Sequence, residues 1–478
     1  MASDLNIPAH ASNRTAFFQK NKERLLLLLI SSIAAGFFFL HLRAYAIDDA
    51  WITYRYAENL AEGNGFVYNH GERVLGTSTP LYTLLLAVIH LFGGYIPVAS
   101  QVIGFVSTIF VVVITYCLMR RLDSPVAGLL ASTFLVFAPE FHTVSAYGME
   151  TPLYMACIVL AFYCYAREKL FQATIFCALC FLIRFDGLAV GFAMMVVYGF
   201  HEKRIPWKHL LLFLVLTLPW LLFSMFYFGS IFPNSFLAKR LHDSSHVRTW
   251  MIDWLFNEPL LVLAVFGAII GLTRKRKVEA ALLFWMLCYA TAFAFSDLYG
   301  HKWYRSPLCI PLVIFAAIGV RRVVPLLPIS SGARKIAAVV LVTVLLIPDL
   351  YSTGIKLSDG TYGEIPVEDT RYQAVHWIKE NVEKDAVIAS SGIGHLGYLT
   401  GNYILDTAGL VSPQVVQKEG ASDFFQFGIT TFKPPYIFQA MTGIPAFLKK
   451  DYEIVNRWKT GDKIFPQFVL LKRLEAVP

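Results

Sequence analysis

Two adjacent aspartates, Asp48 and Asp49, are the first residues of this chain whose position suggests chemistry. They begin a segment, Asp-Asp-Ala-Trp-Ile-Thr-Tyr-Arg-Tyr, that is predicted to form a helix ending at Gly63. One aspartate is enough to cap a helix N-terminus, so capping leaves the second unexplained. Because a helix N-terminus keeps a carboxylate ionised, the pair suits a base or a cation ligand better than a proton donor.

Other polar and ionisable residues interrupt the apolar chain in short segments. Glu150 is a second acidic candidate for the chemistry. Candidates for contacts with a phosphate or another part of a substrate are Arg55, Tyr56, Arg73, Arg184, Asp186, Asn234, Lys239, Lys302 and Arg305. For any single segment a solvated loop end is the simpler explanation, so the argument for a site depends on several polar segments occurring on the same face.

Some of these residues have an alternative explanation. Arg184 and Asp186 could form a local ion pair, and Lys239 could extend toward the membrane surface. Lys302 and Arg305 surround two aromatic residues of the kind enriched at membrane interfaces, although such aromatics also suit stacking against sugars.

The helix that begins at the aspartates has one apolar face. Ile52, Tyr56 and Leu60 recur at helical spacing, so this face is expected to rest on the membrane surface.

The composition places most of the chain in a lipid bilayer. Of 478 residues, 56% are hydrophobic and only 15% are charged, and the mean hydropathy is +0.55. Soluble domains carry about 25% charged residues. A disordered chain, a collagen-like chain and a disulfide-rich secreted scaffold are excluded, and the seven cysteines, all in apolar stretches, are expected to be buried thiols.

Twelve apolar runs occur between residues 25 and 351, and the run at 80–93 decides the topology. If this short run does not span, nearly all the basic clusters between spans fall on the cytoplasmic side. The prediction is therefore about 11 transmembrane helices, with a cytoplasmic N-terminus and an extracytoplasmic C-terminal tail. The net charge of +8 is then explained by basic residues that orient the chain in the membrane, and no nucleic-acid partner is expected.

Three parts follow from this topology. Residues 1–24 form a cytoplasmic segment, and residues 25–351 a transmembrane domain whose first outer loop, 43–97, carries juxtamembrane helices. Residues 352–478 form a small extracytoplasmic α/β domain.

Within that tail, residues 369–382 are predicted to be a helix and residues 386–389, 403–406 and 467–472 strands. The spacing Gly392, Gly394, Gly397 matches a dinucleotide-binding pattern. It is interpreted as a glycine turn, because the next acid, Asp406, follows too soon.

The polar segments also carry a resemblance. The Asp48-Asp49-Ala-Trp-Ile-Thr-Tyr-Arg-Tyr-Ala-Glu-Asn-Leu segment, with Gly63-Asn-Gly-Phe-Val-Tyr-Asn and Thr79-Pro-Leu-Tyr, resembles the first outer loop of GT-C membrane glycosyltransferases. Later segments resemble further motifs of that group: Gly148-Met-Glu-Thr-Pro-Leu, Arg184-Phe-Asp-Gly and Phe228-Gly-Ser-Ile-Phe-Pro-Asn-Ser-Phe-Leu-Ala-Lys. The nearest similarity is to the bacterial arabinofuranosyltransferase-like enzymes that use polyprenyl-phosphate sugars. Lipid A aminoarabinose transferases and protein O-mannosyltransferases are more distant.

The resemblance implies a polytopic α-helical GT-C fold and roles for three residues. A first-loop aspartate, here Asp48 or Asp49, would be the catalytic base, and a second-loop acid, here Glu150, would assist. Relatives with pyrophosphate donors hold a metal with two second-loop acids, and only Glu150 matches. A divalent metal, Mg or Mn, held by Asp48, Asp49 and Glu150 therefore stays open as an alternative.

The outer loops also carry four histidines, His70, His242, His246 and His301. They are interpreted as interface or acceptor-facing residues first and as metal ligands second.

These observations predict an inverting glycosyltransferase of the cytoplasmic membrane. Nucleotide sugars are made in the cytoplasm, so a site on the outer face requires a lipid-linked donor. The expected partners are a polyprenyl-phosphate sugar, membrane lipids and a lipid, glycan or protein acceptor. The alternatives are a lipid or solute transporter, which the absence of an internal repeat disfavours, and a scaffold without activity.

Overall fold

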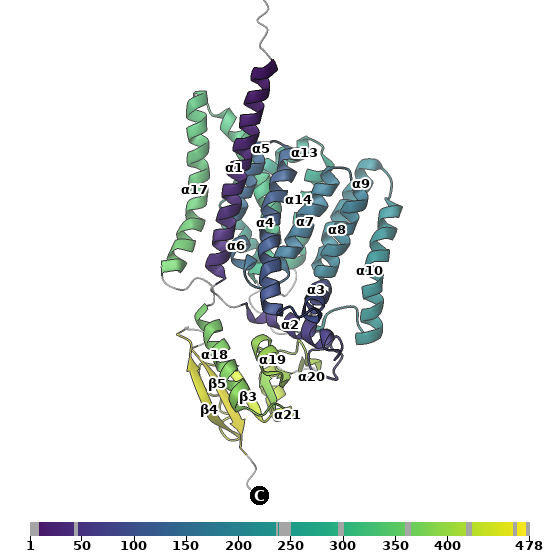
Figure 1. The fold of residues 1–478 in the computed structure, drawn as a ribbon, viewed down its shortest axis with the longest axis vertical. Coiled ribbons are helices and arrows are strands. Elements are labelled where there is room, and N and C mark those ends of the chain that lie inside the picture. Colours follow the sequence, from purple (N-terminus) through teal and green to yellow (C-terminus); the bar gives the residue numbers. More distant parts are fainter. Residues whose placement is uncertain are drawn as a thin grey trace, which may run out of the picture.

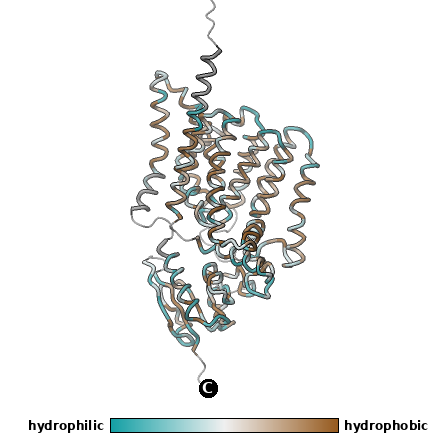
Figure 2. Tube along the Cα trace, viewed as in Figure 1, coloured by the Kyte–Doolittle hydropathy of each residue, from teal (hydrophilic) through white to brown (hydrophobic). Residues whose placement is uncertain are grey.

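The computed structural model describes residues 9–42, 46–235, 238, 250–294, 301–358, 365–416, 423–461 and 466–474. A helical bundle forms the larger, upper part of the molecule, and a small sheet with helices lies below it (Figure 1). The beginning of helix α1 and the C-terminal sheet lie at opposite ends of the bundle (Figure 1). Apolar sequence predominates in the bundle, whereas the lower part is mixed (Figure 2).

Thirteen helices of the described residues make up the bundle. They are α1 (Ala9–His41), α4 (Ile96–Leu122), α5 (Pro125–Phe137), α6 (Pro139–Ser145), α7 (Thr151–Ala166), α8 (Leu170–Ile183), α9 (Leu188–Glu202), α10 (Trp207–Phe228), α12 (Trp250–Asn257), α13 (Leu261–Thr273), α14 (Lys277–Ala294), α16 (Cys309–Val323) and α17 (Ser331–Ser358). Six segments are long and apolar enough to cross a membrane, or eight if each of two bent helix pairs is one span. The prediction of about 11 spans stays a prediction.

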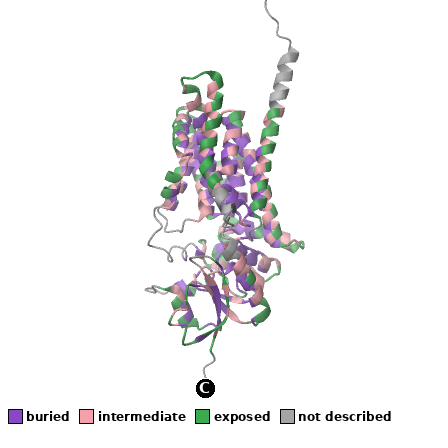
Figure 3. Cartoon of the chain, turned by 90° about the vertical axis from the view of Figure 1, so that its left-hand side faces the viewer, coloured by how far each residue is buried: buried purple, intermediate pink, exposed green. Residues whose placement is uncertain are grey.

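The outer faces of the bundle are apolar yet exposed. On α10, for example, Leu211, Leu214 and Val215 are all at least 45% exposed, and green exposed positions run along the bundle surface (Figure 3). A soluble protein rarely leaves so much apolar surface uncovered, whereas lipid covers it without cost. All seven cysteines are free thiols, and five of them are buried.

The basic loops between helices gather at one end of the bundle. Asp123, after α4, forms ion pairs with Arg274 at 3.5 Å and Arg321 at 3.6 Å. Lys277 reaches Glu168 at 3.5 Å and Glu202 at 3.6 Å. These contacts connect the loops after α4, α7, α9, α13 and α16, so the clusters that the positive-inside argument grouped together do share one end.

Shorter elements occupy the opposite end. They are α2 (Asp48–Ala61), α3 (Pro80–Leu91), α15 (Lys302–Arg305) and the 3₁₀ turns η1 (Phe185–Gly187) and η2 (Ser306–Leu308), while η3 (Val324–Leu326) follows α16 at the basic end. Helix α3 has 12 residues and is about 18 Å long, too short to cross the hydrocarbon core, which agrees with the non-spanning prediction.

Two expectations for α2 are wrong. The N-cap is Ile47, without a side-chain capping bond, so neither aspartate caps its own helix. Ile52 and Tyr56 pack in an apolar cluster with Ile393 and Leu396 of the C-terminal part, so this face is covered by protein, not by the membrane surface.

The C-terminal part is a five-stranded mixed sheet with helices. Its elements are α18 (Ile365–Asn381), β1 (Val387–Ser390), α19 (Gly394–Thr400), β2 (Tyr403–Asp406), α20 (Pro413–Val416), α21 (Phe424–Phe432), β3 (Tyr436–Ala440), β4 (Tyr452–Lys459) and β5 (Gln467–Arg473). The strand order is β2-β1-β3-β5-β4, in which β1 is parallel to β2 and β3, and β5 is antiparallel to β3 and β4. The predicted helix and strands of this part are confirmed, with bounds that differ by at most four residues. The domain boundaries stay a prediction, since α17 continues through residue 352.

Candidate active site

A cavity of about 220 Å³ lies where α2 meets the loops at the non-basic end of the bundle. Segments far apart in the sequence line it: Asp49, Ile52, Thr53, 76–79, Met149, Glu150, 184–186, Phe232, Pro233, Ser235, Phe293, Trp303, Tyr304 and Leu410. Four of the residues singled out from the sequence, Asp49, Glu150, Arg184 and Asp186, therefore converge on one cavity. The coincidence of polar segments that the sequence indicated is present in the structure.

Arg184 is held by two of the acids of this cavity. Its Nε donates to Asp186 Oδ1 at 3.1 Å, and its Nη2 donates to Asp186 Oδ2 at 2.7 Å. Its Nη1 lies 3.5 Å from Glu150 Oε1 and donates to the Trp303 carbonyl at 3.1 Å. Tyr289 donates to Asp186 Oδ2 at 2.9 Å. The local ion pair of Arg184 and Asp186 is thus real, and it forms part of the cavity wall.

Burial affects the protonation of Glu150. Glu150 is only 4% exposed, and burial raises the pKa of its carboxyl, while the Arg184 charge opposes that rise and the Asp49 charge adds to it. An acid and a guanidinium buried together depend on each other, because removal of either leaves the other charge without compensation.

Asp48 makes contacts with the C-terminal part. Its Oδ2 accepts a hydrogen bond from the Gly394 N–H at 3.0 Å, and its Oδ1 accepts one from the His395 N–H at 2.9 Å. Arg371 Nη1 lies 3.3 Å from Oδ1, and His395 Nδ1 lies 3.0 Å from it. Burial alone would raise the pKa of Asp48, but Arg371 and the hydrogen bonds from His395 outweigh it and hold that pKa well below its usual range.

Asp49 points elsewhere, because consecutive residues of a helix are about 100° apart around its axis. It is half-buried and lines the cavity with Glu150 and Arg184. It also lines a second cavity, on the side of the C-terminal sheet. Asp49 is therefore the acid of the pair that a molecule bound in the first cavity can reach.

Arg55 and Tyr56 do not line the cavity. Arg55 is 4% exposed and donates to the carbonyl oxygens of Tyr68 at 2.7 Å, Gly397 at 2.5 Å and Asn402 at 2.8 Å. Tyr56 donates to the Val74 carbonyl at 2.7 Å. These contacts fasten α2 to the first outer loop and to the C-terminal part, so they favour a structural role for both.

The remaining candidates do not line the cavity. Arg73 is exposed and stands 4.6 Å over the ring of Tyr227. Asn234 donates to the carbonyls of residues 409 and 410 at 2.6 and 2.9 Å. Lys302 is half-buried, and Arg305 lies 3.9 Å from Glu140.

Three candidates cannot be placed. Lys239, His242 and His246 lie outside the residues that the structure describes.

Comparisons with solved structures show the fold. The structure of ArnT from Cupriavidus metallidurans bound to undecaprenyl phosphate matches with a TM-score of 0.61 at 12% identity, over 94% of this chain and 98% of that one. The archaeal oligosaccharyltransferase AglB from Archaeoglobus fulgidus, in complex with an inhibitory peptide and a dolichol-phosphate, matches with a TM-score of 0.61 at 12% identity, over 88% of this chain and 70% of that one. This chain has the GT-C fold of membrane glycosyltransferases.

A curated sequence relative agrees with this GT-C fold. The terminal β-(1→2)-arabinofuranosyltransferase of Mycobacterium tuberculosis is 25% identical over 265 residues. The match covers 49% of this chain and 42% of that protein, so the chain spans less than half the length of this relative. Residues 362–471 match a domain of unknown function, DUF8728. The GT-C resemblance inferred from the polar segments is therefore confirmed.

The three proposed metal ligands of the GT-C site do not form a coordination group. Asp48 turns to the C-terminal part, whereas Asp49 and Glu150 face the cavity. Among the described residues, one group of three carboxylates or histidines has ligand atoms within 4.8 Å of one another, and it is Glu58, Glu62 and His90.

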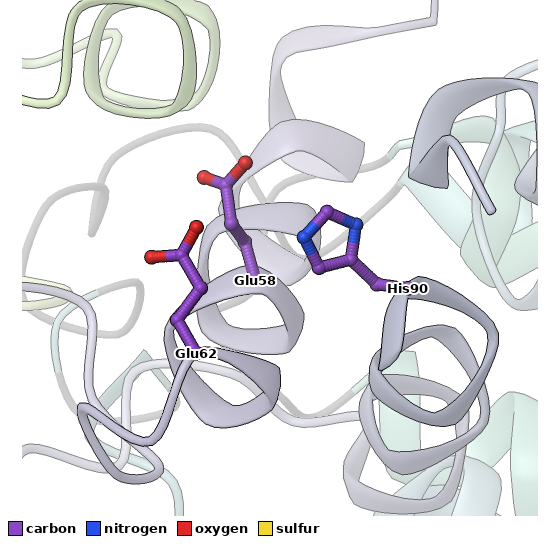
Figure 4. A group of neighbouring side chains, drawn as sticks. All are labelled: Glu58, Glu62 and His90. Atoms are coloured by element: carbon purple, nitrogen blue, oxygen red, sulfur yellow. The ribbon is translucent and has the colours of Figure 1, made fainter. Parts of the chain in front are cut away.

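That group lies on α2 and α3, where the two carboxyl groups and the imidazole face one gap (Figure 4). None of its members lines the cavity. A divalent metal at the cavity, which Asp49, Glu150 and Asp186 line, stays an alternative, and the chemistry below uses the side chains alone.

Sequence reasoning missed two features of the site. Thr53, Thr77 and Thr79 form a buried hydroxyl cluster beside Asp49, with oxygen–oxygen distances of 3.0 to 3.5 Å. Arg371 and His395, from the C-terminal part, are the partners of Asp48. Thr53 and Thr79 lie in segments that carry the GT-C resemblance and could have been noticed as hydroxyl donors. Nothing in the sequence signals the contact of the tail with α2.

Proposed function

We propose that this chain is a membrane glycosyltransferase that moves a single sugar, with inversion, from a polyprenyl-phosphate donor to an acceptor hydroxyl. The observation that carries the proposal is the cavity in which Asp49 faces Glu150, Arg184 and Asp186, at the end of the bundle opposite the basic loops. With those basic loops in the cytoplasm, the cavity opens on the outer face of the cytoplasmic membrane. Two of the similar structures hold a lipid phosphate, and the sequence relative is an arabinofuranosyltransferase, which supports a lipid-linked donor.

The proposed reaction is a single displacement at the anomeric carbon. Asp49 accepts the proton of the acceptor hydroxyl, and the oxygen attacks the anomeric carbon from the face opposite the phosphate. The bond between the anomeric carbon and the phosphate oxygen breaks, and the polyprenyl phosphate leaves with the electron pair. One displacement at this carbon inverts its configuration.

The leaving phosphate needs positive charge or hydrogen-bond donors. Among the described residues, Arg184 is the one arginine or lysine that lines the cavity, and Asp186 and Glu150 hold its guanidinium in place. The hydroxyls of Thr53, Thr77 and Thr79 add neutral donors at the same wall. Preorganised donors of this kind stabilise charge that develops on a leaving group.

Asp49 is proposed as the base in place of Asp48 because their surroundings differ. Asp48 already accepts hydrogen bonds from Gly394 and His395, and it is 8% exposed. A base must reach the hydroxyl that it deprotonates, and Asp49 lines the cavity.

The test is sugar transfer by the purified protein in lipid nanodiscs. A panel of radiolabelled polyprenyl-phosphate sugars, beginning with arabinofuranose because of the named relative, is supplied with a membrane extract, with and without EDTA. Transfer from one donor that is lost in Asp49→Asn and kept in the exposed control Asp385→Asn supports the proposal. Undiminished transfer in Asp49→Asn contradicts the assigned base, and no transfer from any donor by folded protein favours a transporter.

A further inference from the structure

A second cavity lies between α2 and the C-terminal sheet. It is lined by Ile47, Asp48, Asp49, His301, Trp303, Arg371, 390–392, 438–440 and Phe468. Asp49 and Trp303 line both cavities. A molecule in the second cavity can therefore reach the proposed base from a cavity other than the one assigned to the donor.

The position of this cavity in the sheet is one where α/β proteins bind ligands. Parallel strands β2, β1 and β3 lie in that order, so the chain leaves β1 toward one side and returns to the other side for β3. The carboxyl ends of β1 and β3 are separated at this switch point, where ligands bind in open α/β sheets. Residues 390–392 after β1 and 438–440 of β3 line the cavity.

Polar groups at this edge form a fixed pair. Gln439 Nε2 lies 2.7 Å from Ser391 Oγ, and Gln439 Oε1 accepts from the Ser391 N–H at 3.0 Å. An amide and a hydroxyl together can both donate and accept, so they match the hydroxyl groups of a polyol. Ser391 is exposed and Gln439 half-buried, so a ligand can reach the pair.

Aromatic rings give the second cavity an apolar surface beside this polar pair. His301 and Trp303 stack with ring centroids 4.1 Å apart and planes within 8°, and Phe438 and Phe468 stack at 5.4 Å. A pocket of apolar rings with a few fixed polar groups is the usual form of a small-molecule site. Rings next to hydroxyl partners suit a sugar, which has an apolar ring face and a polar edge.

The charges of the cavity disfavour an anion. Among the described residues, Arg371 is the one arginine or lysine that lines it, and Arg371 is paired with Asp48 at 3.3 Å. Asp49 adds a carboxyl group to the wall. A phosphate or carboxylate placed here would face like charge, which selects against anionic ligands.

We propose that this second cavity, at the carboxyl edge of the DUF8728 sheet, binds an uncharged carbohydrate acceptor and presents its hydroxyl to Asp49. Gln439 and Ser391 are its specificity-determining residues. The acceptor role rests on the proposed function, whereas carbohydrate binding does not depend on the donor. The domain of unknown function thereby selects a glycan in place of an anionic lipid or a protein.

The test is direct binding to the full chain in lipid nanodiscs, which avoids sugar-headed detergents. The probes are methyl arabinofuranoside, methyl mannopyranoside, methyl galactopyranoside and methyl glucopyranoside, with glucose 6-phosphate as the charged comparator. Saturation-transfer NMR titrations give the affinity. At least one methyl glycoside is expected to bind saturably, and glucose 6-phosphate at least tenfold more weakly.

Two substitutions distinguish this site from other surfaces. Gln439→Leu is expected to weaken glycoside binding about tenfold or more, because it removes the amide, while Gln426→Leu, on an exposed position of the same domain, leaves it unchanged. In transfer assays, Gln439→Leu raises the acceptor KM by a similar factor with little change in kcat. Equal glycoside affinity in Gln439→Leu, no saturable glycoside binding, or tighter binding of glucose 6-phosphate overturns the inference.

A third substitution separates this inference from the proposed function. Asp186→Asn lies in the first cavity only, so it is expected to abolish transfer and to keep glycoside binding. If no donor supports transfer but glycosides bind through Gln439, the proposed function is contradicted and the carbohydrate site is supported. If transfer occurs and Gln439→Leu leaves the acceptor KM unchanged, the acceptor site is contradicted and the proposed function is not.

Discussion

Asp48 Oδ2 accepts a hydrogen bond of 3.0 Å from the backbone N–H of Gly394, a residue 346 positions further along the chain. The contact joins the first outer helix to the C-terminal sheet. The neighbouring Arg55 donates to the Gly397 carbonyl at 2.5 Å, and Tyr68 donates to the Ile393 carbonyl at 2.7 Å. The glycine pattern of the tail is therefore part of an interface with α2, and α2 also carries Asp49, so the C-terminal part fixes the position of the proposed base.

The first prediction concerns the close approach at Gly394. A Cβ at this position would overlap with the Asp48 carbonyl, which is backbone and cannot move aside. Gly394→Ala is expected to lower the free energy of unfolding by about 1–3 kcal/mol, as overpacking does, and to lower transfer activity by displacing α2. Thermal unfolding and limited proteolysis of the C-terminal part measure the effect.

The matched control is Gly443→Ala in the same domain, where an added Cβ meets nothing within 4 Å. Equal unfolding temperatures for the two variants would contradict the role of this close approach.

The sequence was sufficient to predict those features that depend on local pattern or on charge. The apolar runs, the grouping of basic loops at one end and the strand at 403–406 follow from periodicity and the positive-inside rule. The convergence of Glu150, Arg184 and Asp49 was predicted because all three are costly at a membrane boundary unless they are used.

What could not be predicted depends on contacts between distant segments. Asp48 and Asp49 are equivalent in sequence, and only the packing of Gly394 and His395 on α2 distinguishes them. Ile52 was expected on the membrane surface because an amphipathic pattern shows that a face is covered, but not by what.

The second prediction concerns the pH dependence that Asp48 contributes. Its folded-state pKa lies below the usual value of about 4, so its ionised form stabilises the fold above that value. The stabilisation is lost as pH falls below about 4 toward the folded-state pKa. Asp48→Asn is expected to lower the free energy of unfolding at pH 7 by about 1.5–3 kcal/mol.

The measurement is urea unfolding from pH 2 to pH 7 for both proteins. The difference between them is expected to shrink toward the acidic end, because below about pH 4 the unfolded chain binds a proton at this carboxyl and the folded protein does not. A constant difference across this range would show that Asp48 has no depressed pKa in the folded protein.

The third prediction concerns Asp406, whose pKa is shifted in the opposite direction to that of Asp48. It is fully buried, and burial raises its pKa to about 6 although the N–H groups of Val411 and Ala408 donate to its carboxylate. The unfolded chain ionises this group near pH 4, so its contribution is fully present below pH 4 and is lost as pH rises to about 6. The loss amounts to about 3 kcal/mol for a shift of roughly two pKa units.

Asp406→Asn removes this titration, and its amide oxygen keeps an acceptor for one of the two N–H groups. The other N–H group loses its acceptor, which destabilises the variant by an amount that does not depend on pH. The free energy of unfolding, measured between pH 4 and pH 7, should therefore decrease more steeply with pH in the unsubstituted protein than in the variant. Parallel curves for the two proteins would contradict a raised pKa at Asp406.

The last prediction concerns the geometry of Arg184. Its planar guanidinium meets Asp186 through two nitrogens and reaches Glu150 and the Trp303 carbonyl through the third. Lysine keeps the charge but cannot make this set of contacts, because its ammonium is a single point. Arg184→Lys is expected to lower kcat/KM for the polyprenyl-phosphate donor by about 100-fold, the size of effect seen when one preorganised donor is removed.

Donor kinetics at saturating acceptor measure this loss, and Arg322→Lys, an exposed position at the basic end, is the matched control. If Arg184 binds only the ground state of the donor, KM rises and kcat is kept. If it stabilises the departing phosphate, as proposed, kcat falls together with kcat/KM. Near-normal kinetics in Arg184→Lys would mean that the leaving group departs without help from this guanidinium, and the phosphate contact would then have to be sought outside the Arg184 network.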